Sequence, residues 1–154
     1  MANYIGEHGC KIDAKGRVNL PKDILKQFEF KGPAIFVVNR SVFEKCLVLY
    51  TLDDYNKLLD KLNKLNRFKK ENDEFIRRFT NGAVMVEMDS SNRILISKRH
   101  IEYADLKSDI LLNASLNRFE IWSDEKYRAK MDSYEDMEGF AKLAERVMGS
   151  LDDD

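Results

Sequence analysis

Long apolar runs are missing from this chain of 154 residues. No stretch approaches the roughly 20 consecutive apolar residues that cross a bilayer. The opening segment, Met1-Ala-Asn-Tyr-Ile-Gly-Glu-His8, lacks the basic and apolar regions of a signal peptide. We therefore expect a cytoplasmic protein that has no membrane partner.

Cysteine is also scarce, since Cys10 and Cys46 are the only two. Neither belongs to a CxxC pair or to a zinc-ligand spacing. The two thiols fit a reducing compartment, in which cysteine serves as a small buried apolar side chain. The sequence thus predicts no metal site.

Familiar catalytic motifs are absent as well, including the phosphate loop, HExxH and GxSxG. His8 and Cys10 suggest a nucleophile pair, but residues two apart on a strand lie roughly 6–7 Å apart, beyond hydrogen-bond reach. His100 is expected to be a surface or core side chain rather than a ligand. We predict no enzyme, no catalytic residue, no cofactor and no small-molecule substrate.

The formal net charge of −1 conceals an asymmetry along the chain. Residues 1–50 carry 8 basic and 5 acidic side chains, whereas residues 124–154 carry 5 and 10. A basic first half is compatible with a face that binds a polyanion, but near-neutrality argues against coating nucleic acid by charge alone. If DNA is the partner, several copies of the basic face must act together.

What the sequence does contain is a tandem duplication. Asp13-Ala-Lys-Gly-Arg-Val-Asn-Leu-Pro-Lys22 recurs 76 residues later as Asp89-Ser-Ser-Asn-Arg-Ile-Leu-Ile-Ser-Lys98, and later blocks recur in the same order. A half of about 75 residues buries only a marginal core alone. We therefore predict two related halves, 1–80 and 81–154, that form one interleaved unit.

Each half predicts the same order of elements. Strands are expected at 8–13, 17–20, 34–38, 46–51, 83–88, 93–96, 109–113 and 118–123, with short helices at 22–28 and 98–104. Gly16 supplies a positive φ in the first turn, and Asn92 tolerates that region in the second. Pro21 suits the first position of a helix, and Ser97 in its place is a good N-cap.

At the end of each half, apolar residues recur at helical spacing, which predicts amphipathic helices. One begins after Asp53, and a second carries Phe75, Ile76 and Phe79. Near the C-terminus, Phe140, Leu143, Ala144 and Val147 recur at helical spacing, which predicts core or partner packing. The acidic segment 132–154 is either a packed helix with a loose tail or a shield over the basic face, and the spacing favours the helix.

The repeated motif places an aspartate and an arginine four apart across a turn, as Asp13 with Arg17 and Asp89 with Arg93. One interpretation is a structural ion pair that holds the turn. The other is that Arg17 presents its guanidinium to a phosphate or a guanine edge while Asp13 orients it. Lys11, Lys15 and Lys22 lie close by in the sequence, which favours binding without deciding it.

Four segments together resemble the MraZ family of bacterial transcriptional regulators: Asp13–Pro21, Phe43–Tyr50, Met88–Ile96 and Arg118–Trp122. The similarity covers essentially the whole chain. It implies an α+β fold, a pseudo-twofold duplicated swapped-hairpin β-barrel of the AbrB-like class with flanking helices. It also implies ring-shaped homo-oligomers that bind repeated promoter boxes upstream of the division and cell-wall genes, including the regulator's own gene, usually as a repressor on the nucleoid.

The resemblance also assigns roles to residues. Lys15 and Arg17 correspond to the main contacts with double-stranded DNA, Asp13 orients the arginine, and Lys11 and Lys22 are phosphate partners by charge and position. Asp89 and Arg93 correspond to a second motif concerned with subunit packing.

The second half departs from the family at three places. Asn92 and Asn113 stand where glycine is usual, and Ser97-Lys98 where proline is usual. Two alternatives also stay open, an assembly scaffold that has lost DNA binding and an antitoxin-like swapped-hairpin protein.

Overall fold

The computed structural model describes residues 3–134 and 136–151. Residues 1–2 and 152–154, which entered the predictions about a signal peptide and an acidic tail, lie outside the described residues, as does residue 135 of the acidic segment. The chain forms two compact units, Met1–Asp124 and Glu125–Asp154, and each is treated by itself below.

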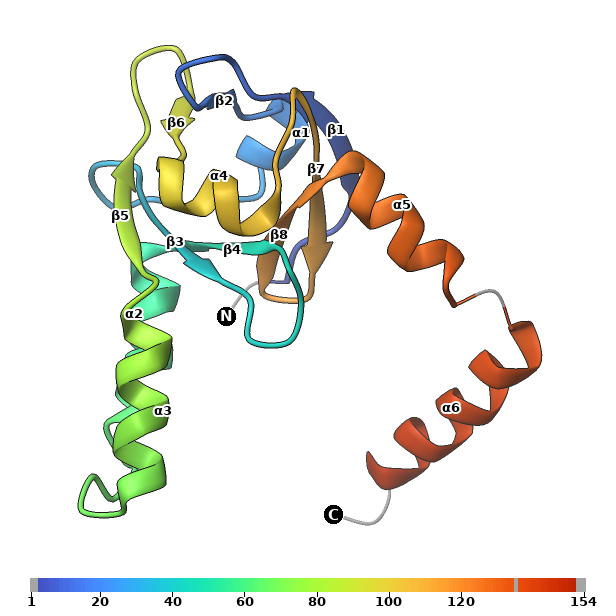
Figure 1. Ribbon diagram of the computed structural model, residues 1–154. Coiled ribbons are helices and arrows are strands. Elements are labelled where there is room, and N and C mark those ends of the chain that lie inside the picture. Colours follow the sequence, from blue (N-terminus) through green and yellow to red (C-terminus); the bar gives the residue numbers. More distant parts are fainter. Residues whose placement is uncertain (1–2, 135, 152–154) are drawn as a thin grey trace. The chain divides into compact units, whose positions relative to one another are not determined.

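The elements follow the predicted order. In the first half they are β1 (Glu7–Lys11), β2 (Arg17–Asn19), α1 (Lys22–Leu25), β3 (Ile35–Arg40), β4 (Leu47–Thr51), α2 (Leu52–Leu62) and α3 (Lys70–Thr80). In the second they are β5 (Val84–Glu87), β6 (Arg93–Leu95), α4 (Lys98–Ala104), β7 (Asp109–Ser115), β8 (Arg118–Ser123), α5 (Asp124–Asp132) and α6 (Met137–Ser150). The predicted α+β class is confirmed (Figure 1).

The main sheet contains strands of both halves, interleaved in the order β1-β7-β8-β4-β3-β5. All its pairings are antiparallel. Exchanging every strand for its counterpart in the other repeat reverses this order and reproduces it. A pseudo-twofold axis therefore passes between β8 and β4, which pair with each other.

The remaining strands, β2 and β6, form a separate two-stranded ribbon. Figure 1 shows this ribbon at one end of the first unit and the α2–α3 helical hairpin at the other. In the described part of the chain the edge strands β1 and β5 do not pair with each other, so the hydrogen-bonded sheet is open.

The two faces of β4 serve two cores. Leu47 and Leu49 belong to the main core, whereas Val48 and Tyr50 belong to a smaller cluster with Tyr55 of α2. Side chains alternate between faces along a strand, so both faces of β4 are covered.

Two local predictions were wrong by a few residues. Pro21 precedes α1 as its N-cap, with φ −60° and ψ 145°, instead of filling the first helical position. The strand predicted at 34–38 ends later, because β3 continues through Arg40. The Asn39 side chain is buried and donates to the Phe79 carbonyl at 3.0 Å, which anchors α3 to this strand.

The second unit consists of α5 and α6, and neither helix contains a buried residue. Phe140, Leu143 and Val147 are each at least half exposed. The predicted helix is confirmed. Its apolar stripe is exposed within this unit, so packing against a partner stays a prediction. No helix among the described residues is both long and apolar enough to span a bilayer.

Candidate nucleic-acid interface

Asp13 organises the first turn with a single carboxylate. Its Oδ1 accepts hydrogen bonds from the backbone N–H groups of Lys15 and Arg17, each at 2.9 Å. Its Oδ2 accepts from Arg17 Nε at 2.7 Å. The backbone closes the same turn, since the Gly16 N–H donates to the Asp13 carbonyl and Gly16 has φ +88°. Both the ion pair and the glycine conformation follow the prediction.

The hydrogen bond from Nε to the Asp13 carboxylate fixes the orientation of the Arg17 side chain. Within the described residues, no hydrogen bond engages the two terminal amino groups of Arg17. The bonds from the Arg17 backbone and guanidinium and from the Lys15 backbone hold the pKa of Asp13 below its ordinary value. Asp13 therefore stays ionised and aligns a guanidinium whose outer edge can form a two-pronged contact.

The second turn repeats each of these hydrogen bonds to the aspartate side chain. Asp89 Oδ1 accepts from the N–H groups of Ser91 and Arg93, and its Oδ2 accepts from Arg93 Nε, all at 2.9 Å. Asn92 occupies the glycine position with φ +61°. The departure from glycine leaves the turn intact, because asparagine tolerates the left-handed region.

The β2–β6 ribbon brings the two motifs together. Asn19 pairs with Arg93, and Arg17 pairs with Leu95. Paired residues and residues two apart share a face, so Arg17 and Arg93 lie diagonally on one side of the ribbon. Val18 and Ile94 occupy the other side, and both are fully buried. The ribbon thus buries an apolar face and presents two oriented guanidinium groups on the other.

The three lysines predicted to contact DNA differ in whether an acidic side chain already pairs with them. Lys15 is exposed within the first turn, and Lys22 is exposed in the first turn of α1. Lys11 lies on β1 opposite Asp109 of β7, and its ammonium is paired with that carboxylate at 2.5 Å. Part of the charge of Lys11 is therefore already balanced.

Sequence reasoning missed the two neighbours that complete the exposed face, Asn19 and Leu95. Leu95 is 56% exposed, although it is an apolar residue of a strand. Each follows a motif arginine by two positions, so strand alternation places it beside that arginine. Alternation combined with the repeat could have predicted this face.

Cys10, which the sequence suggested as a nucleophile beside His8, lacks the properties of an activated thiol. Cys10 and His8 are half-buried on β1. Burial raises the pKa of Cys10 to about 11, which disfavours the thiolate that a nucleophile requires. His100 is a core side chain whose Nε2 lies 2.7 Å from the Gly82 carbonyl. Among the described residues, no cluster of histidine, cysteine, aspartate and glutamate could hold a metal ion.

Comparison with known proteins matches one family twice along the chain. The family described as "MraZ protein, putative antitoxin-like" matches residues 4–78 and again residues 79–149. The two matches reproduce the duplication seen in the sequence. Together they cover nearly the whole chain.

Three curated relatives carry the same similarity over nearly their full lengths. A protein from Christiangramia forsetii, "Transcriptional regulator MraZ", is 44% identical over 154 residues, covering 100% of this chain and 98% of the relative. Proteins of the same name from Flavobacterium psychrophilum and Cytophaga hutchinsonii are 41% and 37% identical, covering 97% and 96% of those relatives and 100% and 96% of this chain. The chain therefore belongs to the MraZ family.

Proposed function

We propose that this chain is a sequence-specific DNA-binding transcriptional regulator, acting in the cytoplasm on nucleoid DNA. Its targets are repeated promoter boxes upstream of the division and cell-wall genes, including its own gene, and it acts there as a repressor. The names of the relatives support a role in transcription regulation. The observation that carries the proposal is the pair of oriented arginines, Arg17 and Arg93, on one exposed ribbon face.

A guanidinium held at Nε by a carboxylate suits nucleic acid. Its outer edge matches the two acceptors of a guanine or the oxygens of a phosphate. Lys15 extends the positive charge within the first turn, and Lys11 and Lys22 provide weaker phosphate contacts nearby. In this proposal Arg17 is the principal contact, Asp13 orients it, and Asp89 with Arg93 joins the DNA face or a neighbouring subunit.

One ribbon neutralises few phosphates, so a single chain would bind weakly at cellular salt. We therefore propose a homo-oligomeric ring that presents several ribbons to spaced boxes, since linked contacts raise avidity by orders of magnitude. We also propose that the open sheet and the β2–β6 ribbon together form a swapped-hairpin barrel. The halves 1–80 and 81–154 remain the proposed repeat units.

The test is a binding titration against the DNA upstream of the protein's own gene, beside scrambled DNA of equal length, over a salt series. Arg17→Ala should abolish the preference for the promoter fragment, and the slope of log K against log salt should weaken by about 0.9 per lost phosphate contact. Lys64→Ala is the matched control, because it removes one exposed positive charge from the α2–α3 connection.

Arg93→Ala separates the two roles proposed for the second motif. Weaker DNA binding at unchanged particle mass would place Arg93 on the DNA face. A smaller particle would place it between subunits. Wild-type protein that does not distinguish promoter from scrambled DNA would refute the regulator proposal and favour the scaffold alternative.

A further inference from the structure

The exposed face of the β2–β6 ribbon consists of two cross-strand pairs. Arg17 lies directly opposite Leu95, and Arg93 lies directly opposite Asn19. Side chains that face each other across an antiparallel pair have Cβ atoms about 5 Å apart. Leu95 is 56% exposed, and Asn19 is exposed as well. Each motif arginine therefore has a different neighbour, an apolar side chain beside Arg17 and an amide beside Arg93.

Leu95 points outward because both of its neighbours in the chain face the core. Ile94 and Ile96 are buried in the main core. The Ile96 N–H donates to the Gly16 carbonyl at 2.8 Å, which joins the end of β6 to the first turn. A Cβ added at Gly16 would lie 3.7 Å from Leu95 Cδ1. The leucine methyl groups thus lie beside the turn that orients Arg17.

The dimensions of this ribbon suit the major groove of DNA. The groove is about 12 Å wide and admits a two-stranded β-ribbon, whose strands lie about 5 Å apart. Successive bases of one DNA strand are about 3.4 Å apart, so paired side chains of the ribbon reach the same base pair or the next one. The leucine side chain has no hydrogen-bonding atom. The apolar group that the groove edge offers to such a side chain is the C5-methyl of thymine.

We infer that Leu95 contacts the C5-methyl group of a thymine next to the base that Arg17 holds. The contact favours thymine over cytosine, which carries only a hydrogen at C5, so Leu95 is a specificity-determining residue. Asn19 occupies the equivalent position of the first repeat, 76 residues earlier, and its polar amide makes no such contact. The inference rests on the proposed DNA-binding function and names one base that the site selects.

Uracil tests this contact because it is thymine without the C5-methyl group. The DNA upstream of the protein's own gene is prepared once with thymidine and once with deoxyuridine, and each form is titrated with full-length protein beside scrambled DNA of equal length. Wild type should bind the thymidine form about fourfold more tightly for each methyl group that Leu95 covers. Leu95→Ala, and Leu95→Asn, which keeps the branched shape, should bind the two forms equally.

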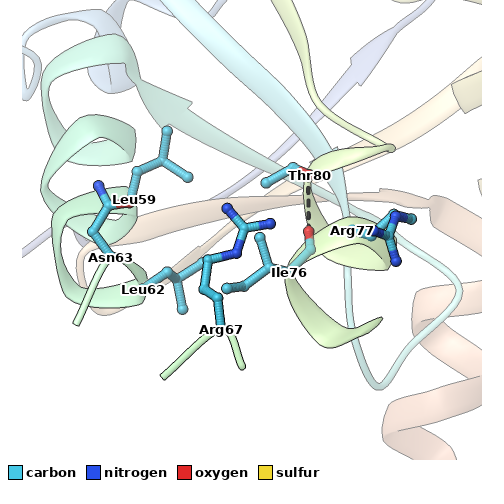
Figure 2. Close-up of a pocket in the computed structure, with 7 residues that line it drawn as sticks. All are labelled: Leu59, Leu62, Asn63, Arg67, Ile76, Arg77 and Thr80. Atoms are coloured by element: carbon cyan, nitrogen blue, oxygen red, sulfur yellow. Dashed lines mark hydrogen bonds between the residues drawn. The ribbon is translucent and has the colours of Figure 1, made fainter. Parts of the chain in front are cut away.

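Two matched variants control for effects outside the contact. Asn19→Ala changes the equivalent position on the same face, and Leu62→Ala removes a leucine side chain elsewhere. Figure 2 shows Leu62 in a groove of the α2–α3 hairpin, which lies at the opposite end of the first unit from the ribbon (Figure 1). Both controls should keep the wild-type preference for thymidine. Circular dichroism checks that each variant is folded, and light scattering compares its particle mass with that of wild type.

The outcomes separate this contact from the proposed function. A wild type that prefers the promoter fragment to scrambled DNA but binds its thymidine and deoxyuridine forms equally would overturn the thymine contact and leave the regulator proposal standing. Leu95→Ala protein that still prefers thymidine would overturn the role of Leu95.

A smaller particle for either Leu95 variant would place this side chain between subunits and would also overturn the inference. A wild type that does not distinguish the promoter fragment from scrambled DNA would refute the proposed function and the thymine contact together.

Discussion

Val18 and Ile94 lie directly opposite each other across the β2–β6 ribbon, and neither side chain is exposed to solvent. They are equivalent positions in the two repeats, so the local pseudo-twofold axis passes between them. Each immediately follows a motif arginine. Burial of this pair therefore determines which way both guanidinium groups face.

Ile94→Ala should destabilise the protein by about 2–5 kcal/mol, because it empties a fully buried site at the centre of the ribbon. The free energy of unfolding from urea denaturation measures this. Leu95→Ala, at the adjacent exposed position, should change that free energy by less than about 0.5 kcal/mol. Equal effects at the two positions would contradict the proposed inward and outward faces.

Gly16→Ala should cost about 1–3 kcal/mol, because the residue has φ +88° and an added Cβ would lie 2.7 Å from the Ile96 carbonyl oxygen. Thermal unfolding gives the loss. The counterpart Asn92→Gly should alter stability by less than about 1 kcal/mol, since glycine adopts the same region freely. A Gly16→Ala protein as stable as wild type would show that the turn can rearrange.

Acid should weaken the motif turns. Because the folded-state pKa of Asp13 is depressed, its contribution to stability is present above the unfolded value of about 3.9 and is lost as pH falls through the folded value. Carboxyl carbon shifts in a pH titration report the pKa directly. Arg17→Ala should raise the pKa of Asp13 while the pKa of Asp89 stays low. An unchanged Asp13 pKa in that variant, with the backbone donors also intact, would show that the guanidinium contributes little.

We predict that protonation of His100 causes a second loss of stability on acidification, in a pH range above that of Asp13. Burial, and then the nearby Arg99 and Arg40, lower its pKa despite the Gly82 carbonyl, which favours the charged form. As pH falls below about 6.5, the unfolded chain binds a proton that the folded chain resists, so stability decreases. Within the described residues its Nδ1 has no hydrogen-bond partner, so a proton there gains nothing from the fold.

The matching experiment compares urea midpoints at pH 7.5 and 5.5 for wild type and His100→Gln. Glutamine can still donate to the Gly82 carbonyl but does not titrate. The midpoint of the variant should shift less between the two pH values than that of wild type. Parallel shifts would assign the pH dependence to other groups.

Much of the candidate site could be predicted from the sequence because it is local. Asp13 and Arg17 are four residues apart across one tight turn, so the spacing alone brings carboxylate and guanidinium together. Asp89 and Arg93 follow the same rule. Ser97 as an N-cap is confirmed by its hydrogen bond from the His100 N–H at 3.2 Å.

Other features depended on contacts between distant segments. The partner of Lys11 is Asp109, 98 residues away, and no local pattern indicates it. The apolar spacing of α6 predicted a helix but did not show whether the same chain would cover its stripe. Amphipathic periodicity fixes the face that seeks burial, whereas its partner depends on the surfaces that remain after the core is formed.

The sequence by itself determined the duplication, the order of strands and helices and the two aspartate–arginine turns, because these depend on repeats, side-chain periodicity and bonds within a few residues. Only the tertiary structure decided that β2 pairs with β6 and that Arg17 and Arg93 share a face. Pairing across 76 residues is selected by burial of Val18 and Ile94 against the common core, and a shift of either strand by one residue would turn the arginine of that strand inward.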